Sequence, residues 1–267
     1  MILFVFEGQK EEPHVMATIK HLFFSGREKQ MFCSFGCDTY ALWQEVRKYL
    51  TDGGEPDVFE IVRERLHTRD DHSLDGYYSY QFDSVYLFFD YDPQNGTICL
   101  GELNSAIEHM IHTFSDPMGN GLLLLSYPMT EALYCENCLP DSDYMNAVVP
   151  IADCHDFKTW CQRYDFAKKR YKLTFKTNKA GEISEQVTDI RQNELLASWN
   201  ELIKLNASKA NDLCCSSSGL PLNESDISQN RIFRRQLELF ILPAGNVTIL
   251  SAFPLFLFEY FHGNGSF

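Results

Sequence analysis

Four carboxylates follow two strongly apolar segments of the chain. Glu7 and Glu11 come after the run ILFVF, and Asp90 and Asp92 belong to the segment FFDYD. Continuous apolar runs are typical of strands buried on both faces of a parallel sheet. Because parallel strands end at the same edge, we expect these carboxylates to meet there. Carboxylate oxygens bind Mg²⁺ or Mn²⁺ in preference to zinc, so the sequence predicts a divalent-metal site.

The spacing within each pair supports this interpretation. Gly8 permits a turn after Glu7, so that Glu11 can reach back from the first turn of a helix. Asp90 and Asp92 point to the same face if strand geometry persists, with Tyr91 facing the other way. Each acidic residue alone would be an ordinary surface residue or helix cap. It is the combination of two strands, each followed by a carboxylate pair, that predicts a site.

Alternating strand and helix signals predict an α/β core over residues 1–150, with an open, mostly parallel sheet flanked by helices. The expected strands cover residues 2–6, 31–35, 84–89 and 121–126. The expected helices cover residues 12–24, 38–50, 57–66 and 104–114, the last of them capped by Asn104.

The second half of the chain has mainly helical patterns. We expect helices at residues 157–172, 183–205 and 231–242, a short strand at 247–251 and a closing apolar helix at 254–261. Residues 151–267 are therefore expected to form a mostly helical extension packed on the core. The closing segment has no Lys or Arg among its aromatic residues, which favours core packing over base stacking.

Composition narrows the classes of function. The chain has 267 residues and 45% hydrophobic residues, which is enough for a buried core. A formal net charge of −14 argues against a freestanding nucleic-acid-binding protein. It does not exclude a nuclease, because bound cations offset clustered carboxylates. No export signal or membrane-spanning run is visible, so we expect a cytoplasmic protein with no membrane contact.

The motifs EGxxE and DxD resemble the Toprim fold of topoisomerases, primases and the OLD-type and RloB-like nucleases. The segment SYPMTEALY, residues 126–134, is similar to the proline and glutamate motif of the RloB-like and AriB-like branch. The resemblance covers the first half of the chain. It implies a Toprim-like sheet in which Glu7, Glu11, Asp90 and Asp92 are catalytic carboxylates that hold the metal, with Glu131 as a further catalytic glutamate.

By this resemblance the chain would be a metal-dependent endonuclease that uses two Mg²⁺ or Mn²⁺ ions to hydrolyse phosphodiesters of RNA, tRNA or DNA. The long interval between Glu7 and Asp90 implies an inserted helical segment at residues 53–80. OLD-type nucleases also place a lysine near the scissile phosphate, and the weak substrate-binding candidates here are Lys168, Lys169 and Lys172.

The relatives also suggest a partner. The sequence has no GxxxxGK[ST] motif for ATP binding. The resemblance therefore implies a separately encoded ABC-type ATPase that controls a toxin-like effector in anti-phage defence. Homo-oligomerisation within a larger complex stays open.

The sequence favours an endonuclease, but a non-catalytic alternative also stays open. In it, a Toprim-like subunit binds the ATPase and keeps its carboxylates for structural metal or partner contacts. The acidic charge favours this alternative, whereas retention of all four carboxylates favours the nuclease.

The cysteines form a competing metal motif. Cys135 and Cys138 are spaced as CxxC, with Cys154 and Cys161 downstream, and four such ligands would suit zinc. The second pair is irregularly spaced. The sequence therefore favours reduced thiols, and we do not expect zinc there.

Overall fold

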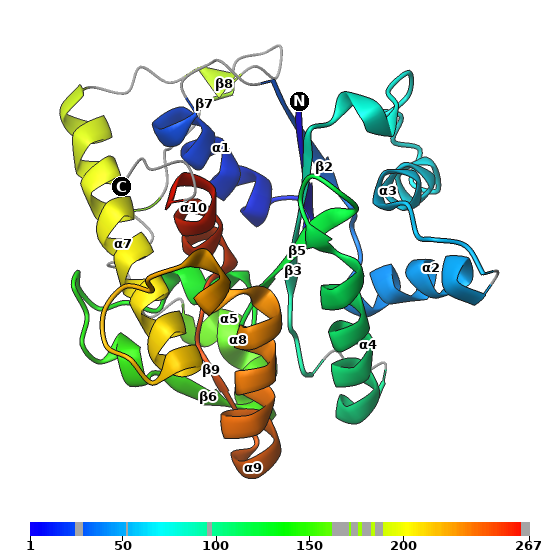
Figure 1. Cartoon of the computed structure of the whole chain (residues 1–267). Helices are drawn as coiled ribbons and strands as arrows, with labels where there is room; N and C mark the ends of the chain where they lie inside the picture. Colours follow the sequence, from blue (N-terminus) through cyan, green and yellow to red (C-terminus); the bar gives the residue numbers. More distant parts are fainter. Residues whose placement is uncertain are drawn as a thin grey trace.

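The centre of the fold is a five-stranded sheet in the order β2-β1-β3-β5-β4 (Figure 1). The computed structural model describes residues 1–24, 29–51, 53–94, 98–161, 171, 176–177, 183–184 and 189–262. The parallel strands are β1 (Ile2–Phe6), β2 (Gln30–Ser34), β3 (Ser84–Asp90) and β5 (Gly121–Ser126). The short strand β4 (Ser115–Asp116) pairs antiparallel with β5 at one edge.

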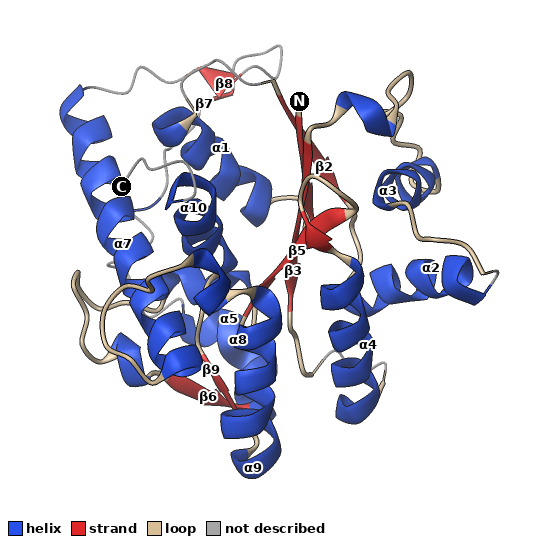
Figure 2. Cartoon of the chain, in the orientation of Figure 1, coloured by secondary structure: helices blue, strands red, loops and turns tan. Residues whose placement is uncertain are grey.

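Helices cover both faces of this sheet (Figure 2). One layer contains α1 (Glu11–Phe23) and α10 (Ala252–His262), with α7 (Asp189–Cys215) packed against both. The other layer contains α2 (Thr39–Thr51), α3 (Val58–His67) and α4 (Leu100–Thr113). The predicted α/β class, with a mostly parallel sheet flanked by helices, is therefore confirmed, and α3 lies where an inserted helical segment was expected.

The second half of the chain is mostly helical, as predicted. Besides α7 and α10 it contains α5 (Phe157–Cys161), α8 (Gln229–Gln236), a π-helical turn (Leu237–Ile241) and α9 (Leu242–Ala244). Two small antiparallel pairs join β6 (Val148–Pro150) to β9 (Asn246–Thr248), and β7 (Lys176–Thr177) to β8 (Ile183–Ser184). No helix in the described ranges has the length and apolar character needed to cross a membrane.

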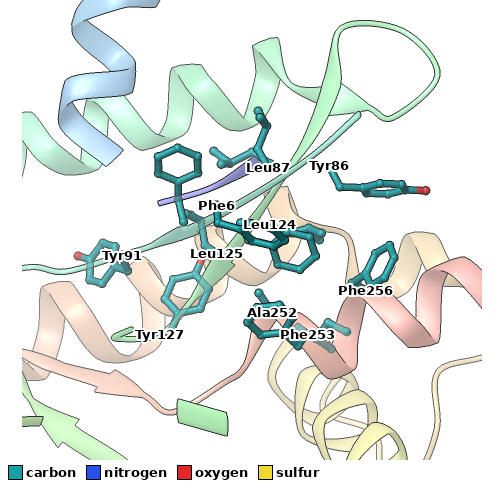
Figure 3. Packing of buried hydrophobic residues seen from close by; sticks show 14 of the residues in the cluster. Phe6, Tyr86, Leu87, Tyr91, Leu124, Leu125, Tyr127, Ala252, Phe253 and Phe256 are labelled. Atoms are coloured by element: carbon teal, nitrogen blue, oxygen red, sulfur yellow. The ribbon is translucent and has the colours of Figure 1, made fainter. Parts of the chain in front are cut away.

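The apolar runs form a core between sheet and helices. Every residue of β1 and β5 is buried, as expected for strands covered on both faces. The closing helix α10 is also buried, with Phe253 stacked on Phe88 at 4.7 Å and Phe256 edge-to-face with Tyr86 at 4.8 Å between ring centroids (Figure 3). The aromatic segment at the end of the chain is thus part of the core, as its composition predicted.

The strand order places a topological switch point at the centre of the sheet. From β1 the chain passes through α1 to β2 on one side, and it then returns through α2 and α3 to β3 on the other side of β1. The carboxyl ends of β1 and β3 therefore flank the crevice where open α/β sheets commonly bind ligands.

Several predicted boundaries differ from the structure. Asn104 does not cap a helix, because α4 already begins at Leu100, and its buried Oδ1 instead accepts a hydrogen bond from the Tyr91 hydroxyl (2.7 Å). Residues 183–184 form β8 rather than a helix, and α7 extends over Asp189–Cys215. Of the helix expected at residues 157–172, α5 ends at Cys161 and most of the remainder lies outside the described residues.

Candidate metal centre

Glu7 and Asp90 meet at the carboxyl edge of the sheet. The ladder between β1 and β3 continues one residue past β1, because the backbone N–H of Glu7 donates to the carbonyl of Phe88 (2.9 Å). Asp90 is the last residue of β3 and pairs with Ser126 of β5. The carboxylate of Glu7 then accepts a hydrogen bond from the backbone N–H of Asp90 (2.9 Å). Two residues that are distant in the sequence thus lie together at the switch point.

Thr130 links Asp90 to a third carboxylate, that of Glu12. Its backbone N–H and its hydroxyl lie 2.8 and 3.0 Å from Asp90 Oδ1, and the hydroxyl lies 3.4 Å from Glu12 Oε1. Glu12 Oε1 also accepts the backbone N–H of Gly8 (3.2 Å). A Cβ atom at Gly8 would lie 2.5 Å from Glu12 Oε2, so a larger residue at this position would displace the carboxylate of Glu12.

Glu11 lies beside this group but has a different partner. It is the first residue of α1 and accepts a hydrogen bond from the hydroxyl of Tyr134. Successive helical residues point in directions about 100° apart, and it is the buried Glu12 that joins Asp90 and Thr130. The EGxxE motif ends at Glu11, so Glu11 was predicted as a ligand. Glu12, the next residue in the sequence EGQKEE, was not predicted.

These side chains line a pocket of about 310 Å³. Glu131 from the 3₁₀ helix Thr130–Tyr134 faces Lys158 of α5 across it, with 3.8 Å between Oε1 and Nζ. Glu131 Oε2 is buried without a hydrogen-bond partner. The lining residues are Glu7, Gly8, Gln9, Lys10, Glu11, Glu12, Asp90, Thr130, Glu131 and Lys158.

Asp92 departs from the expected strand alternation. β3 ends at Asp90, and Asp92 has a left-handed backbone with a φ of 33°, because its N–H turns to donate to the carbonyl of Pro128 (2.9 Å). Asp92 does not line the pocket. Its charge instead acts on Glu7 together with that of Asp38, whose Oδ1 accepts the backbone N–H of Ala41 (2.8 Å) at the start of α2. Glu7 therefore belongs to two carboxylate groups.

Burial and mutual repulsion raise the pKa values of these acids. Burial raises the pKa of Glu7 to about 8; the hydrogen bond from Asp90 opposes the rise, whereas repulsion from Glu12, Asp38 and Asp92 adds to it. Burial, followed by repulsion from Glu7, Glu12 and Glu131, raises the pKa of Asp90 well above its ordinary value. Burial is also the main cause of the raised pKa values of Glu131 and Asp92. A cation in the pocket would relieve this repulsion.

Lys158 is one of the two lysines that line the pocket, the other being Lys10. Burial alone would lower the pKa of Lys158, but the negative charges of Glu131, Asp90, Glu12 and Glu7 raise it overall. The side chain is 63% exposed, so its ammonium group remains accessible from solvent. No motif around Lys158 marks it in the sequence. The predicted candidates Lys168, Lys169 and Lys172 lie outside the described residues.

The donor set fits a hard cation, although the carboxylates do not surround a common point. Oxygen donors predominate in the pocket, and the unpaired Glu131 Oε2 could accept such an ion. Among the described residues, one group of at least three His, Cys, Asp or Glu has its ligand atoms all within 4.8 Å: His67, His72 and Asp75, far along the chain from Glu7. Binding at the pocket would therefore require rotation of carboxylate side chains.

The four cysteines of the competing zinc motif do not converge in the described structure. Cys135 and Cys161 lie 2.9 Å apart between sulfur atoms. Cys138 and Cys154 instead contact the carbonyls of Pro140 and Pro150, respectively. The geometry thus supports one thiol pair rather than a four-ligand site.

Comparisons of the chain with protein-family models, with curated proteins and with solved structures found no match. The Toprim resemblance therefore stays a prediction from motifs.

Proposed function

We propose that this chain is a metal-dependent nuclease of Toprim-like type, which hydrolyses nucleic-acid phosphodiesters at the sheet-edge pocket. The observation that carries the proposal is the convergence of Glu7, Glu12, Asp90 and Glu131 at the switch point of the sheet. Carboxylates with raised pKa values in a crevice are typical of functional sites. Several carboxylates in one pocket supply the oxygen ligands that hard cations prefer.

The electrostatics of the pocket support a cation as its ligand. Three of its carboxylates repel Asp90, and that repulsion can be lowered either by protons or by bound cations. Two Mg²⁺ or Mn²⁺ ions would supply an activated water and a stabilised leaving oxygen. We infer that Glu7, Glu12 and Asp90 hold the ions, while Asp92 and Asp38 act through the second carboxylate group around Glu7.

The remaining lining residues suit a phosphodiester substrate. The exposed ammonium group of Lys158 lies opposite Glu131 and can contact a phosphate oxygen at the rim. Glu131 combines a raised pKa with a buried oxygen that has no hydrogen-bond partner, and both properties suit a proton acceptor. The net charge of −14 implies that bound ions or a partner must offset repulsion of the nucleic acid. We propose a separately encoded ABC-type ATPase as that partner, which follows from the motif resemblance alone.

One observation favours the non-catalytic alternative. The carboxylates already satisfy internal donors: Glu7 accepts from Asp90, Glu12 accepts from Gly8, and Asp90 accepts from Thr130. Such links could serve only to fix the sheet edge of an interaction subunit. In that case mutation of the pocket would change stability or partner binding without affecting any cleavage.

The test is a cleavage assay with labelled RNA, tRNA and DNA, in Mg²⁺ or Mn²⁺, with and without a candidate ATPase. We expect Glu7→Gln and Asp90→Asn to lower cleavage by more than about 100-fold, a loss that removal of even an outer-shell partner can cause at a metal site. Glu136→Gln is the matched control, because Glu136 is a fully buried carboxylate with a raised pKa that does not line the pocket. Undiminished cleavage in both pocket variants would refute the proposed site.

A further inference from the structure

A second group of potential metal ligands lies at the C-terminal end of α3 and in the loop that follows it. The two carboxylate oxygens of Asp75 face two imidazoles, with Oδ1 2.6 Å from His67 Nε2 and Oδ2 3.1 Å from His72 Nδ1. The two rings lie 5.3 Å apart between centroids. One ligand atom from each of the three side chains lies within 4.8 Å of the other two. Two imidazoles and one carboxylate thus surround a common point.

A fourth side chain orients one of these imidazoles. Asp70 Oδ1 lies 3.3 Å from His72 Nε2, the ring nitrogen that faces away from Asp75. Histidines that bind a metal usually donate their other ring N–H to a carboxylate or carbonyl, which fixes the tautomer and the ring orientation. Asp70 is placed to accept that hydrogen bond, which would leave Nδ1 of His72 free to bind an ion.

Local structure holds the loop in this shape without an ion. Leu74 is buried and anchors the segment in the core. The backbone N–H groups of Asp70 and Asp75 donate to the carbonyls of His67 (3.1 Å) and His72 (3.0 Å), respectively. Because these contacts fix the backbone of the loop, metal binding would not have to order it.

We propose that His67, His72 and Asp75 bind one transition-metal ion, such as Zn²⁺ or Ni²⁺, with Asp70 as the positioning residue of His72. Imidazole ligands favour these ions over Mg²⁺, which favours oxygen ligands alone. The three protein ligands are exposed, which leaves room for water to complete a tetrahedral or larger coordination shell. This site is independent of the proposed nuclease pocket.

An ordinary surface pair of histidine and aspartate is the competing explanation, and the chain contains one for comparison. His155 Nε2 lies 3.0 Å from Asp156 Oδ2, and the His155 side chain is 59% exposed, close to the 58% of His72. His155 belongs to no group of three ligands in the described part of the chain. His155→Ala is therefore a matched control for His72→Ala.

The experiment titrates the full, chelator-treated chain with Ni²⁺ and with Co²⁺, in excess Mg²⁺ that occupies the oxygen-rich pocket. Binding is measured by calorimetry and by the visible spectrum of bound Co²⁺, which reports imidazole ligands. We expect His67→Ala and His72→Ala each to remove one equivalent of bound ion, and His155→Ala to remove none. We expect Asp70→Asn to keep the equivalent but to weaken its affinity by about tenfold, because the carboxylate that orients the His72 imidazole would be lost.

Several results would overturn the proposal. One is an unchanged stoichiometry and affinity in both His67→Ala and His72→Ala, and another is an equal loss in His155→Ala. Because His72 lies in an exposed loop rather than in α3, its variant keeps the test decisive even if His67→Ala impairs folding. We expect Glu7→Gln to keep the equivalent of ion bound by the histidines. The test of this site is therefore valid whether or not the nuclease proposal is correct.

Discussion

The sheet-edge pocket and the loop after α3 are two candidate metal sites built in opposite ways. The pocket combines residues from position 7 to position 158, which only the sheet topology and the packing of α5 bring together. The loop group lies within residues 67–75 and needs only one turn of chain. The pocket is partly buried and rich in carboxylates, whereas the loop group is exposed and pairs imidazole with carboxylate. The long-range topology thus brings together carboxylates that repel one another, whereas the local turn brings together imidazoles and a carboxylate, which attract one another.

The pKa values of the carboxylates shift in opposite directions at the two sites. Burial is the main cause that raises the pKa of Glu7 in the pocket, with repulsion from neighbouring carboxylates adding to it. In the loop, the hydrogen bond from His67 is the main cause that lowers the pKa of Asp75. A proton therefore competes with a cation in the pocket, whereas the loop carboxylate is already ionised. The two sites should differ in metal preference, in pH dependence and in sensitivity to nearby substitutions.

The largest expected effect is a reciprocal loss of metal binding. Glu7→Gln or Asp90→Asn should weaken Mn²⁺ binding by more than about 100-fold and leave Ni²⁺ binding at the loop unchanged, because the ligand sets share no residue. His67→Ala should have the converse effect. Calorimetric titration of each variant with both ions measures the two affinities separately. Loss of both ions in a single variant would show that the sites are not independent.

A second difference is the pH dependence of stability. The pKa of Glu7 rises from 4.5 to about 8 on folding, so between these values the folded chain retains a proton that the unfolded chain has released. The stability that this proton provides is complete below about pH 4.5 and is lost as pH rises through about 8. We expect the melting temperature of the metal-free protein, relative to that of Glu7→Gln, to fall by on the order of 5 °C between about pH 5 and pH 8.

Mn²⁺ provides the control for this pH effect. A saturating concentration should remove most of the decline in the wild type, because the ion replaces the proton at the carboxylates. It should not change the profile of Glu7→Gln. If the melting temperatures of the two metal-free proteins changed in parallel with pH, the raised pKa of Glu7 would be contradicted. The claim that the carboxylates of the pocket repel one another would fail with it.

Much of the sheet could be predicted from the sequence, because strands buried on both faces leave a continuous apolar run. The runs ending at Phe6, Phe89 and Ser126 became β1, β3 and β5, and the carboxylates after the first two, Glu7 and Asp90, lie at one edge. The sequence does not show where such a strand stops. Asp92 was expected to face the same way as Asp90. The chain instead turns between the two residues, because the backbone there forms hydrogen bonds to the end of β5 and to the loop that follows it.

The remaining pocket residues depend on information that a sequence pattern does not contain. Glu11 and Glu12 are adjacent, and only the register of α1 decides which of them reaches Thr130. Lys158 reaches the rim because α5 packs against the 3₁₀ helix that carries Glu131. His67 and His72 lie in the helical segment expected at residues 53–80 and were not predicted as ligands, because their spacing matches no common motif and the loop geometry depends on the left-handed backbone of Asp70.

Gly8→Ala tests the close packing that distinguishes the pocket from the exposed loop. The added Cβ would lie 2.5 Å from Glu12 Oε2 and would displace that carboxylate. We expect Mn²⁺ affinity to fall by about tenfold, within the range for disturbed metal-site partners, with no change in Ni²⁺ binding. Gly101→Ala is the control, because a Cβ there meets no atom within 4 Å and its helical position favours alanine. Equal Mn²⁺ affinities in the two variants would show that the position of Glu12 does not matter for binding.

Thr130→Val should have the smallest effect, and it separates orientation from ligation in the pocket. The substitution removes a hydroxyl that lies 3.0 Å from Asp90 Oδ1, but it keeps the backbone N–H that donates to the same oxygen. Loss of one such hydrogen bond costs about 1 kcal/mol, so Mn²⁺ affinity should fall by about fivefold. Thr113→Val is the matched control, since that hydroxyl donates only to the His109 carbonyl within α4 (2.9 Å). An affinity loss as large as that of Asp90→Asn would mean that Thr130 itself binds the ion, and would make the pocket a site of mixed hydroxyl and carboxylate ligands.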